Sequence, residues 1–262
     1  MATDQVPPAA VLVTRPDGEA AQDLCRQVAE RGFEVFHQPL LTLTALDSLE
    51  ASGRQCVLRL DEYAHVIFVS ANAVRFGMNH IEDYWPQLPV GLNWLAIGSA
   101  TARLLGEYGV SARAPVDKMT SEGLLALPEL AGVEGQRVLI VKGRGGRDAL
   151  RRELERRGAR VDELPCYVRG IPSLPEGELV DKLRDWNIAV ILLSSGEGLA
   201  NLQELLRPTE TTKFSGISLI VPSSRVAEQA RNAGFSSVIV ADNASDVAML
   251  NALVSWNASS GE

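Results

Sequence analysis

The chain has few of the residues on which several kinds of site depend. Its three cysteines, Cys25, Cys56 and Cys166, are far apart and form no CxxC spacing. A scattered, odd set of cysteines excludes a disulfide framework and a cysteine-rich zinc site. It predicts reduced thiols in a cytoplasmic protein. A packed thiol is the expected role of each, with a catalytic cysteine as the less common alternative.

Histidine is equally scarce, and the common catalytic motifs are missing. His37, His65 and His80 show no metal-ligand spacing, and HExxH and GxSxG do not occur. The segment KGRGGRD at 142–148 lacks the closing Gly-Lys-Ser/Thr of a phosphate loop and the third glycine of a dinucleotide fingerprint. The sequence therefore predicts no metal and no cofactor, and a site made of hydroxyls, backbone amides, arginines and a tyrosine.

Long apolar runs and an excess of basic charge are also absent. No run approaches the ~18 apolar residues of a membrane span. The first ten residues lack the pattern of a secretory signal, so we expect no membrane partner and no export. The formal net charge of −8 argues against nucleic-acid binding. What remains is an ordinary globular composition, 46% hydrophobic over 262 residues, which is enough for two domains.

Short apolar runs alternate with amphipathic stretches along the whole chain. Helical spacing is clear at 19–31 and 149–157, and each stretch is followed by a glycine. Near-continuous apolar runs separated by helices predict parallel sheets covered on both faces. The predicted strands are 11–14, 66–69, 94–97, 138–141, 190–193 and 219–221.

The same order of segments occurs twice. Residues 11–40 resemble 138–167, and HVIFVSANAV at 65–74 resembles AVILLSSGEG at 189–198. The shifts are 127 and 124 residues, and 94–110 matches 218–235 with a similar shift. Constant order and offset favour a duplication of about 125 residues over chance similarity, and therefore two similar domains rather than a solenoid.

Two long extended segments stand at matching places in the two copies. Residues 33–46 read as extended for about 14 residues, longer than an ordinary strand. Residues 159–171 also read as extended, with an interruption at Pro165. We interpret the pair as a two-stranded ribbon that joins the domains, and a loop with one buried strand is the alternative.

Small and polar residues follow every predicted strand. Ligands of open parallel sheets bind beyond the carboxyl ends of the strands, where helix N-termini favour anions. Plain helix capping is the alternative role for each hydroxyl. The candidate substrate-binding residues at these ends are Arg15, Ser70, Asn72, Ser99, Thr101, Gly143, Ser194, Ser195, Gly196, Ser223 and Ser224.

One segment is basic within this acidic chain. Residues 142–160 hold eight basic and three acidic side chains. Lys142, Arg144 and Arg147 flank the glycine loop, and we expect them to meet carboxylates of a ligand. The arginines further along the helix, Arg156 among them, are expected on a solvated face.

Taken in order, these segments resemble the uroporphyrinogen-III synthase family over nearly the whole chain. No single motif is specific, and the resemblance depends on their order, the length and the repeat. The segments are VLVTRP at 11–16, VIFVSANAV at 66–74, LAIGSATARLL at 95–105, TSEGLL at 120–125, VLIVKGRGGRDAL at 138–150, ELPCYVR at 163–169, LLSSGEGL at 192–199 and VPSSRVAEQARNAGF at 221–235.

The resemblance implies an α/β fold of two doubly wound parallel-sheet domains, flavodoxin-like and duplicated, joined by a two-stranded β-ladder. Domain 1 would be discontinuous, formed by 1–37 and 172–262, and domain 2 would be 48–160. The ladder would be formed by 38–47 and 161–171. Sequence alone also permits a simple cut near residue 131.

The resemblance also implies an activity. The family closes hydroxymethylbilane, a linear tetrapyrrole with eight carboxylates, into uroporphyrinogen III, with loss of water and inversion of the last pyrrole ring. The family's tyrosine donor falls on Tyr167, which we expect at the mouth of a cleft with an exposed hydroxyl. Thr120 and Ser121 join the substrate-binding set through the TSEGLL match.

The partners implied are this small substrate and, in transient contact, the preceding pathway enzyme, with the protein itself a monomer. A different class stays open on the residues alone: a cleft-binding protein or transferase for another anionic metabolite. A packed tyrosine at a hinge is likewise the alternative role for Tyr167.

Overall fold

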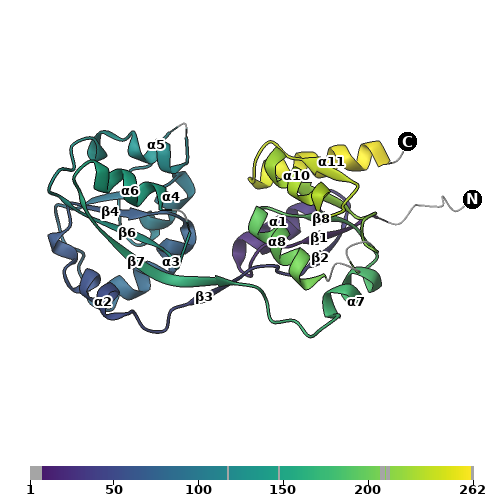
Figure 1. Cartoon of the computed structure of the whole chain (residues 1–262), viewed down its shortest axis with the longest axis horizontal. Helices are drawn as coiled ribbons and strands as arrows, with labels where there is room; N and C mark the ends of the chain where they lie inside the picture. The colour runs from purple at the N-terminus through teal and green to yellow at the C-terminus, as the bar shows by residue number, and fades with distance from the viewer. Residues whose placement is uncertain (1–7, 117, 147, 207–209, 211–212, 261–262) are drawn as a thin grey trace, which may run out of the picture. The chain divides into compact units, whose positions relative to one another are not determined.

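The computed structural model describes residues 8–116, 118–146, 148–206, 210 and 213–260. The chain divides into two compact units. Unit 1 comprises Met1–Thr42 and Gly170–Glu262, and unit 2 comprises Leu43–Arg169. The chain passes between the units twice, within the strands labelled β3 and β7 in Figure 1.

Unit 1 is built on a parallel sheet with the order β10-β9-β8-β1-β2. Its strands are β1 (Ala10–Val13), β2 (Glu34–His37), β8 (Ile188–Leu192), β9 (Ser218–Val221) and β10 (Val238–Val240). Its helices are α1 (Glu19–Ala29), α7 (Glu178–Asp185), α8 (Gly196–Leu205), α10 (Ser224–Asn232) and α11 (Asp246–Ser260).

Both faces of this sheet are covered, as the near-continuous apolar runs predict. Val11 and Val13 of β1 pack in a core with Leu24 of α1 and with α11. Leu12, between them, points the other way into a core with Leu199 of α8 and with α7 and α10. Successive side chains of a strand face opposite sides, so a strand buried on both sides is apolar throughout.

Unit 2 contains a second sheet, with the order β3-β7-β6-β4-β5. Its strands are β3 (Thr42–Ala45), β4 (His65–Phe68), β5 (Asn93–Ala96), β6 (Arg137–Gly143) and β7 (Arg160–Gly170). Its helical segments are α2 (Ala51–Leu58), η1 (Leu60–Glu62), α3 (Ala71–Glu82), α4 (Ser99–Glu107), α5 (Ser121–Leu125), η2 (Pro128–Leu130) and α6 (Ala149–Arg156). One core packs α2, α3 and α4 on the sheet, and another packs α5 and α6.

The repeated sequence segments occupy matching places in the two sheets. The first repeated pair of segments forms β1 with β2 in unit 1 and β6 with β7 in unit 2. In each unit these two strands are neighbours in the sheet. On their other side, β1 and β6 pair with the second repeated segment, β8 in unit 1 and β4 in unit 2. The third repeated segment follows outward in both, as β9 and β5. Similar sequences therefore form similar strand neighbourhoods.

The extended segments differ from the sequence prediction in two ways. Residues 33–46 form two short strands, β2 and β3, with Pro39 between them. Residues 160–170 form one continuous strand, because Pro165 stands beside a register shift at Lys142/Gly143 and does not end the pairing. Leu46 N donates to Cys166 O, and the Thr42 hydroxyl donates to Gly170 O, so β3 runs antiparallel to β7.

The paired segments of the expected ladder are thus an edge of the unit 2 sheet. β7 pairs in parallel with β6 as far as Tyr167. On its other side, only the second half of β7 pairs with β3. Among the described residues, no helix is both long enough and apolar enough to cross a bilayer.

Candidate active site

A cavity of about 430 Å³ opens in unit 2 at the carboxyl ends of β4 and β6, beside β7. This is the edge at which ligands of parallel sheets bind. It brings together six predicted site residues: Ser70, Thr120, Ser121, Lys142, Gly143 and Tyr167. It also contains residues that sequence reasoning did not assign, among them Arg151, Glu163 and Arg169.

Tyr167 lies on β7 with its ring packed inside unit 2. The side chain is nearly buried, at 5% exposure, and its ring centroid lies 5.2 Å from that of Phe76. Its hydroxyl lies 3.4 Å from Ser70 Oγ and borders the cavity. The ring is buried because β7 is a strand of the sheet and α3 covers it, and the role of Tyr167 as a proton donor stays a prediction.

Gly143 leaves the space that the tyrosine ring occupies. It ends β6 directly beside Tyr167 in the register of the two strands. A Cβ atom at Gly143 would lie 2.7 Å from Tyr167 Cζ, closer than carbon atoms can approach. The glycine therefore leaves room for this orientation of the phenol, and its role toward a ligand stays a prediction.

Four of the predicted hydroxyls cap helices, which is the alternative role raised from the sequence. Ser70 Oγ accepts from Ala73 N at 3.0 Å, and Thr120 Oγ1 accepts from Gly123 N at 3.3 Å. In unit 1, Ser195 and Ser223 cap α8 and α10 in the same way. A hydroxyl that accepts from an amide still has its own hydrogen to donate, so capping and anion binding are compatible.

Several predicted residues of unit 2 lie outside this cavity. Thr101 is buried, because it shares the inward face of α4 with Leu105, and its role in substrate binding stays a prediction. Ser99 Oγ donates to Met119 Sδ at 3.9 Å, and neither Ser99 nor Asn72 borders the cavity. Arg144 pairs with Glu50 in an exposed contact at 2.7 Å and lines a different hollow. Arg147 lies outside the described residues.

The predicted residues of unit 1 follow its own strands. Arg15, after β1, pairs with Asp246 and donates to Ala244 O at 3.2 Å. The others follow β8 and β9 at the carboxyl ends of the sheet. They are Ser194, Ser195, Gly196, Ser223 and Ser224, and their role toward a ligand stays a prediction.

Lys142 in the unit 2 cavity already has carboxylate neighbours within the protein. Lys142 Nζ lies 2.9 Å from Glu163 Oε1 and 3.9 Å from Asp148 Oδ1. Its expected role as a freely available cation is therefore limited by Glu163. The described part of the chain contains no group of three or more His, Cys, Asp or Glu side chains that could hold a metal ion.

The cysteines offer no nucleophile in the described structure. All three are free thiols, and Cys56 and Cys166 are buried. Burial raises the pKa of Cys166 to about 12, and it raises the pKa values of Cys25 and Cys56 as well. Cys166 Sγ donates to Lys142 O at 3.3 Å, as a packed thiol does. Thiolate chemistry at neutral pH is therefore disfavoured.

Solved structures share this fold. Uroporphyrinogen-III synthetase from Helicobacter pylori 26695 aligns with a TM-score of 0.62 at 13% identity, covering 95% of this chain and 99% of that one. A mutant uroporphyrinogen III synthase from the extremely thermophilic bacterium Thermus thermophilus aligns with a TM-score of 0.56 at 19% identity, covering 94% and 97%. At these identities the likeness establishes the mixed α/β fold with parallel sheets.

Sequence comparisons are more specific. Uroporphyrinogen-III synthase from Escherichia coli (strain K12) is 32% identical over 248 residues, which are 93% of this chain and 99% of the relative. The enzyme of the same name from Proteus mirabilis is 32% identical over 200 residues, covering 75% and 96%. The family model described as HEM4, uroporphyrinogen-III synthase HemD, matches residues 22–251. The chain belongs to the uroporphyrinogen-III synthase family.

Proposed function

We propose that the protein is a cyclising lyase that converts hydroxymethylbilane into uroporphyrinogen III, with loss of water and inversion of the last pyrrole ring. The observation that carries the proposal is the unit 2 cavity, in which a single phenol, Tyr167, borders a space lined by hydroxyls and cations. Family membership and the length of the match support the same reaction.

Tyr167 is the proposed proton donor to the departing hydroxyl. A phenol O–H can donate a hydrogen bond and then its proton to a leaving oxygen. Its Oη borders the cavity and has Ser70 Oγ as a long hydrogen-bond partner at 3.4 Å. Phe76 and Gly143 hold the ring in one place. A positioned acid of this kind contributes roughly 10²–10⁴-fold to a rate.

The remaining groups bind and orient the substrate. Thr120, Ser121 and Lys142 offer donors that suit the substrate's carboxylates, as do the backbone amides near Gly145. Ring inversion needs the two ends of the chain to be held so that the inverting closure is faster than direct closure. Such positioning alone supplies several orders of magnitude in rate.

A more detailed proposal about the fold goes beyond the mixed α/β class shared with the solved structures. We propose that both units are flavodoxin-like and arose by duplication, with domain bounds near 1–37 with 172–262 and 48–160. In unit 1, the strands taken in chain order lie in the sheet as 2-1-3-4-5, the flavodoxin arrangement. The matched strand neighbourhoods of unit 2 support the duplication. Three free thiols support a reducing, cytoplasmic compartment.

One assay tests the activity. The purified full chain is incubated with hydroxymethylbilane, the products are oxidised, and isomers I and III are separated by chromatography. The substrate closes unaided to isomer I, so isomer III is expected only with the active protein. A product mixture identical to the protein-free control would reject the proposal and favour a protein that binds another anionic metabolite.

A further inference from the structure

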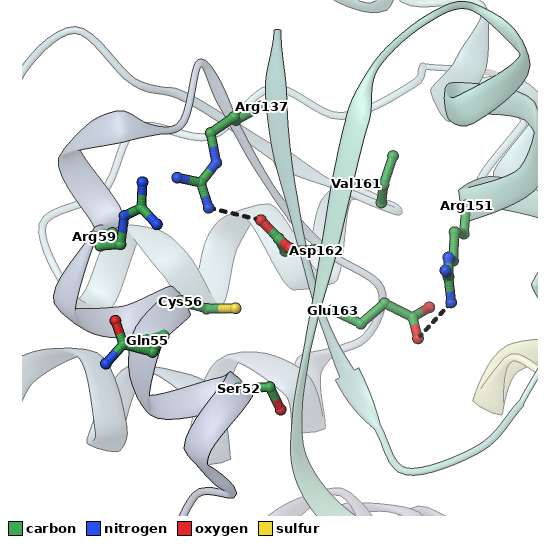
Figure 2. A pocket seen from close by; sticks show the side chains of 9 residues that line it. All are labelled: Ser52, Gln55, Cys56, Arg59, Arg137, Arg151, Val161, Asp162 and Glu163. Carbon is green, nitrogen blue, oxygen red and sulfur yellow. Dashed lines mark hydrogen bonds and ion pairs between the residues drawn. The ribbon is translucent and has the colours of Figure 1, made fainter.

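Three charged side chains from three elements meet on the wall of the unit 2 cavity. Lys142 comes from β6, Glu163 from β7 and Arg151 from α6. Glu163 lies between the two cations, with Oε1 2.9 Å from Lys142 Nζ and Oε2 4.0 Å from Arg151 Nη1. Figure 2 shows the carboxylate of Glu163 facing Arg151, while its neighbour Asp162 turns toward Arg137.

This cluster also borders a second cavity in the same unit. The second cavity measures about 370 Å³ and lies between α2 and the first residues of β7 (Figure 2). Arg151 and Glu163 belong to the linings of both cavities, so their pair forms part of a common wall. The second cavity is lined by Ser52, Gln55, Cys56, Arg59, Arg137, Arg151, Val161, Asp162 and Glu163.

Exposure decides which member of the cluster a ligand can reach. The Lys142 side chain is only 10% exposed, against 23% for Glu163 and 46% for Arg151. An anion can therefore reach the Lys142 ammonium only through the cavity, where Glu163 already supplies a carboxylate. An unpaired ammonium at this depth would be costly, so the lysine needs a carboxylate partner whether or not a ligand is bound.

We propose that Glu163 holds the place of a substrate carboxylate. It pairs with Lys142 in the free protein and gives that position to a carboxylate of the bound substrate. Arg151 then keeps Glu163 as its partner, so none of these three charges is left unpaired. The inference deepens the proposed function and rests on it, since it concerns how the cavity recognises a polycarboxylate substrate.

The exchange has opposite consequences at the two residues. Glu163→Gln removes the nearer competing charge, leaves Asp148 at 3.9 Å, and keeps an oxygen that can accept from Lys142. The KM for hydroxymethylbilane is expected to fall about two- to fivefold, the range of a partly solvated ion pair, with little change in kcat. Arg151→Gln leaves Glu163 with Lys142 alone, so KM is expected to rise by about the same factor.

Matched variants of α6 and its ion pairs control for general effects of charge. Glu155 pairs with Arg151 at 2.9 Å but borders neither cavity, so Glu155→Gln loosens Arg151 without removing charge from the wall. Arg152 is the next residue on α6 and is 79% exposed. Both Glu155→Gln and Arg152→Gln are expected to leave KM within about twofold of the wild type.

The experiment measures KM, kcat, isomer ratio and melting temperature for the full-length wild type and the four variants. A higher KM or a lower kcat for Glu163→Gln, or equal effects of Arg151→Gln and Arg152→Gln, would overturn the inference. If Glu163→Gln does not fold, an unchanged KM for Arg151→Gln overturns it. Failure of the wild type to form isomer III would instead reject the proposed function.

Discussion

Gly143 and Tyr167 face each other across β6 and β7, and the tyrosine ring fills the space where a side chain on residue 143 would stand. A Cβ added at Gly143 would lie only 2.7 Å from Tyr167 Cζ. Gly143→Ala is therefore expected to displace the phenol and to overpack the unit, at a cost of about 1–3 kcal/mol. We expect kcat to fall roughly ten- to a hundredfold, because a misplacement of about 1 Å has effects of that size.

Gly135→Ala separates loss of stability from loss of orientation. Gly135 has a φ of 73°, so alanine is strained there, but an added Cβ would meet nothing within 4 Å. Steady-state kinetics and thermal unfolding of both variants make the comparison. An equal decrease in kcat for the two variants would show that Gly143 does not act through Tyr167.

Ser70 has two roles that can be measured apart. It caps α3 through Ala73 N at 3.0 Å, and it lies 3.4 Å from Tyr167 Oη. Ser70→Ala is expected to lose about 1 kcal/mol of stability through the cap. If Tyr167 is the proton donor proposed above, the variant is also expected to lower kcat about three- to tenfold, because the phenol loses its hydrogen-bond partner.

Ser245→Ala is the matched control for the cap. Ser245 accepts from Ala248 N at 3.3 Å at the start of α11 in unit 1. It should lose a similar stability in urea unfolding while kcat stays at the wild-type value. If Ser70→Ala kept the wild-type kcat, Ser70 would be a helix cap and nothing more.

The sequence predicts the strands of the fold more completely than the residues of the site. The apolar runs at 66–69 and 138–141 correspond to β4 and β6, because burial on both faces leaves a clear signal. Pro39 divides residues 33–46 into two strands, whereas Pro165 is tolerated within β7. Pro165 is tolerated because it stands at a register shift and because β3 pairs with only part of β7. Neither the register nor the extent of pairing can be predicted from the presence of a proline in the sequence.

For the site, the strand-end rule located Ser70, Lys142 and Gly143, which follow or end strands. Glu163 and Arg151 were missed, because they reach the cavity through the pairing of β6 with β7 and the packing of α6. The position of Arg169 in the cavity could have been predicted from the sequence. It stands two residues after Tyr167 on one strand, and such residues share a face.

Asp162 links β7 to β6 and to Tyr63, and this makes the stability of unit 2 sensitive to acid. Its Oδ2 accepts from Arg137 and from Tyr63 Oη, both at 2.8 Å. Burial alone would raise the pKa of Asp162, but hydrogen bonds from Arg137 and Tyr63 outweigh it and lower that pKa. The ionised carboxylate therefore stabilises the fold above its ordinary pKa of ~4, and this contribution is lost as the pH falls below that value.

Asp162→Asn is accordingly expected to lower the urea midpoint at pH 7 and to change it less at pH 3, where protonation of the unfolded chain has already removed part of the wild type's advantage. Asp185, an exposed carboxylate beside Arg184, supplies the control, and Asp185→Asn should shift the midpoint little at either pH. A loss for Asp162→Asn that is equally large at both pH values would contradict a role for the ionised carboxylate.

Isomer analysis of the product formed from hydroxymethylbilane, with the wild type and Tyr167→Phe side by side, is the decisive measurement. The ring is nearly buried and is retained in phenylalanine, and its hydroxyl makes only a long contact with Ser70, so the melting temperature should hardly change. We expect the wild type to form isomer III and Tyr167→Phe to turn over roughly ten- to a thousandfold more slowly. Full turnover to isomer III by Tyr167→Phe, or isomer I alone from the wild type, would contradict a reaction in which this cavity supplies the proton.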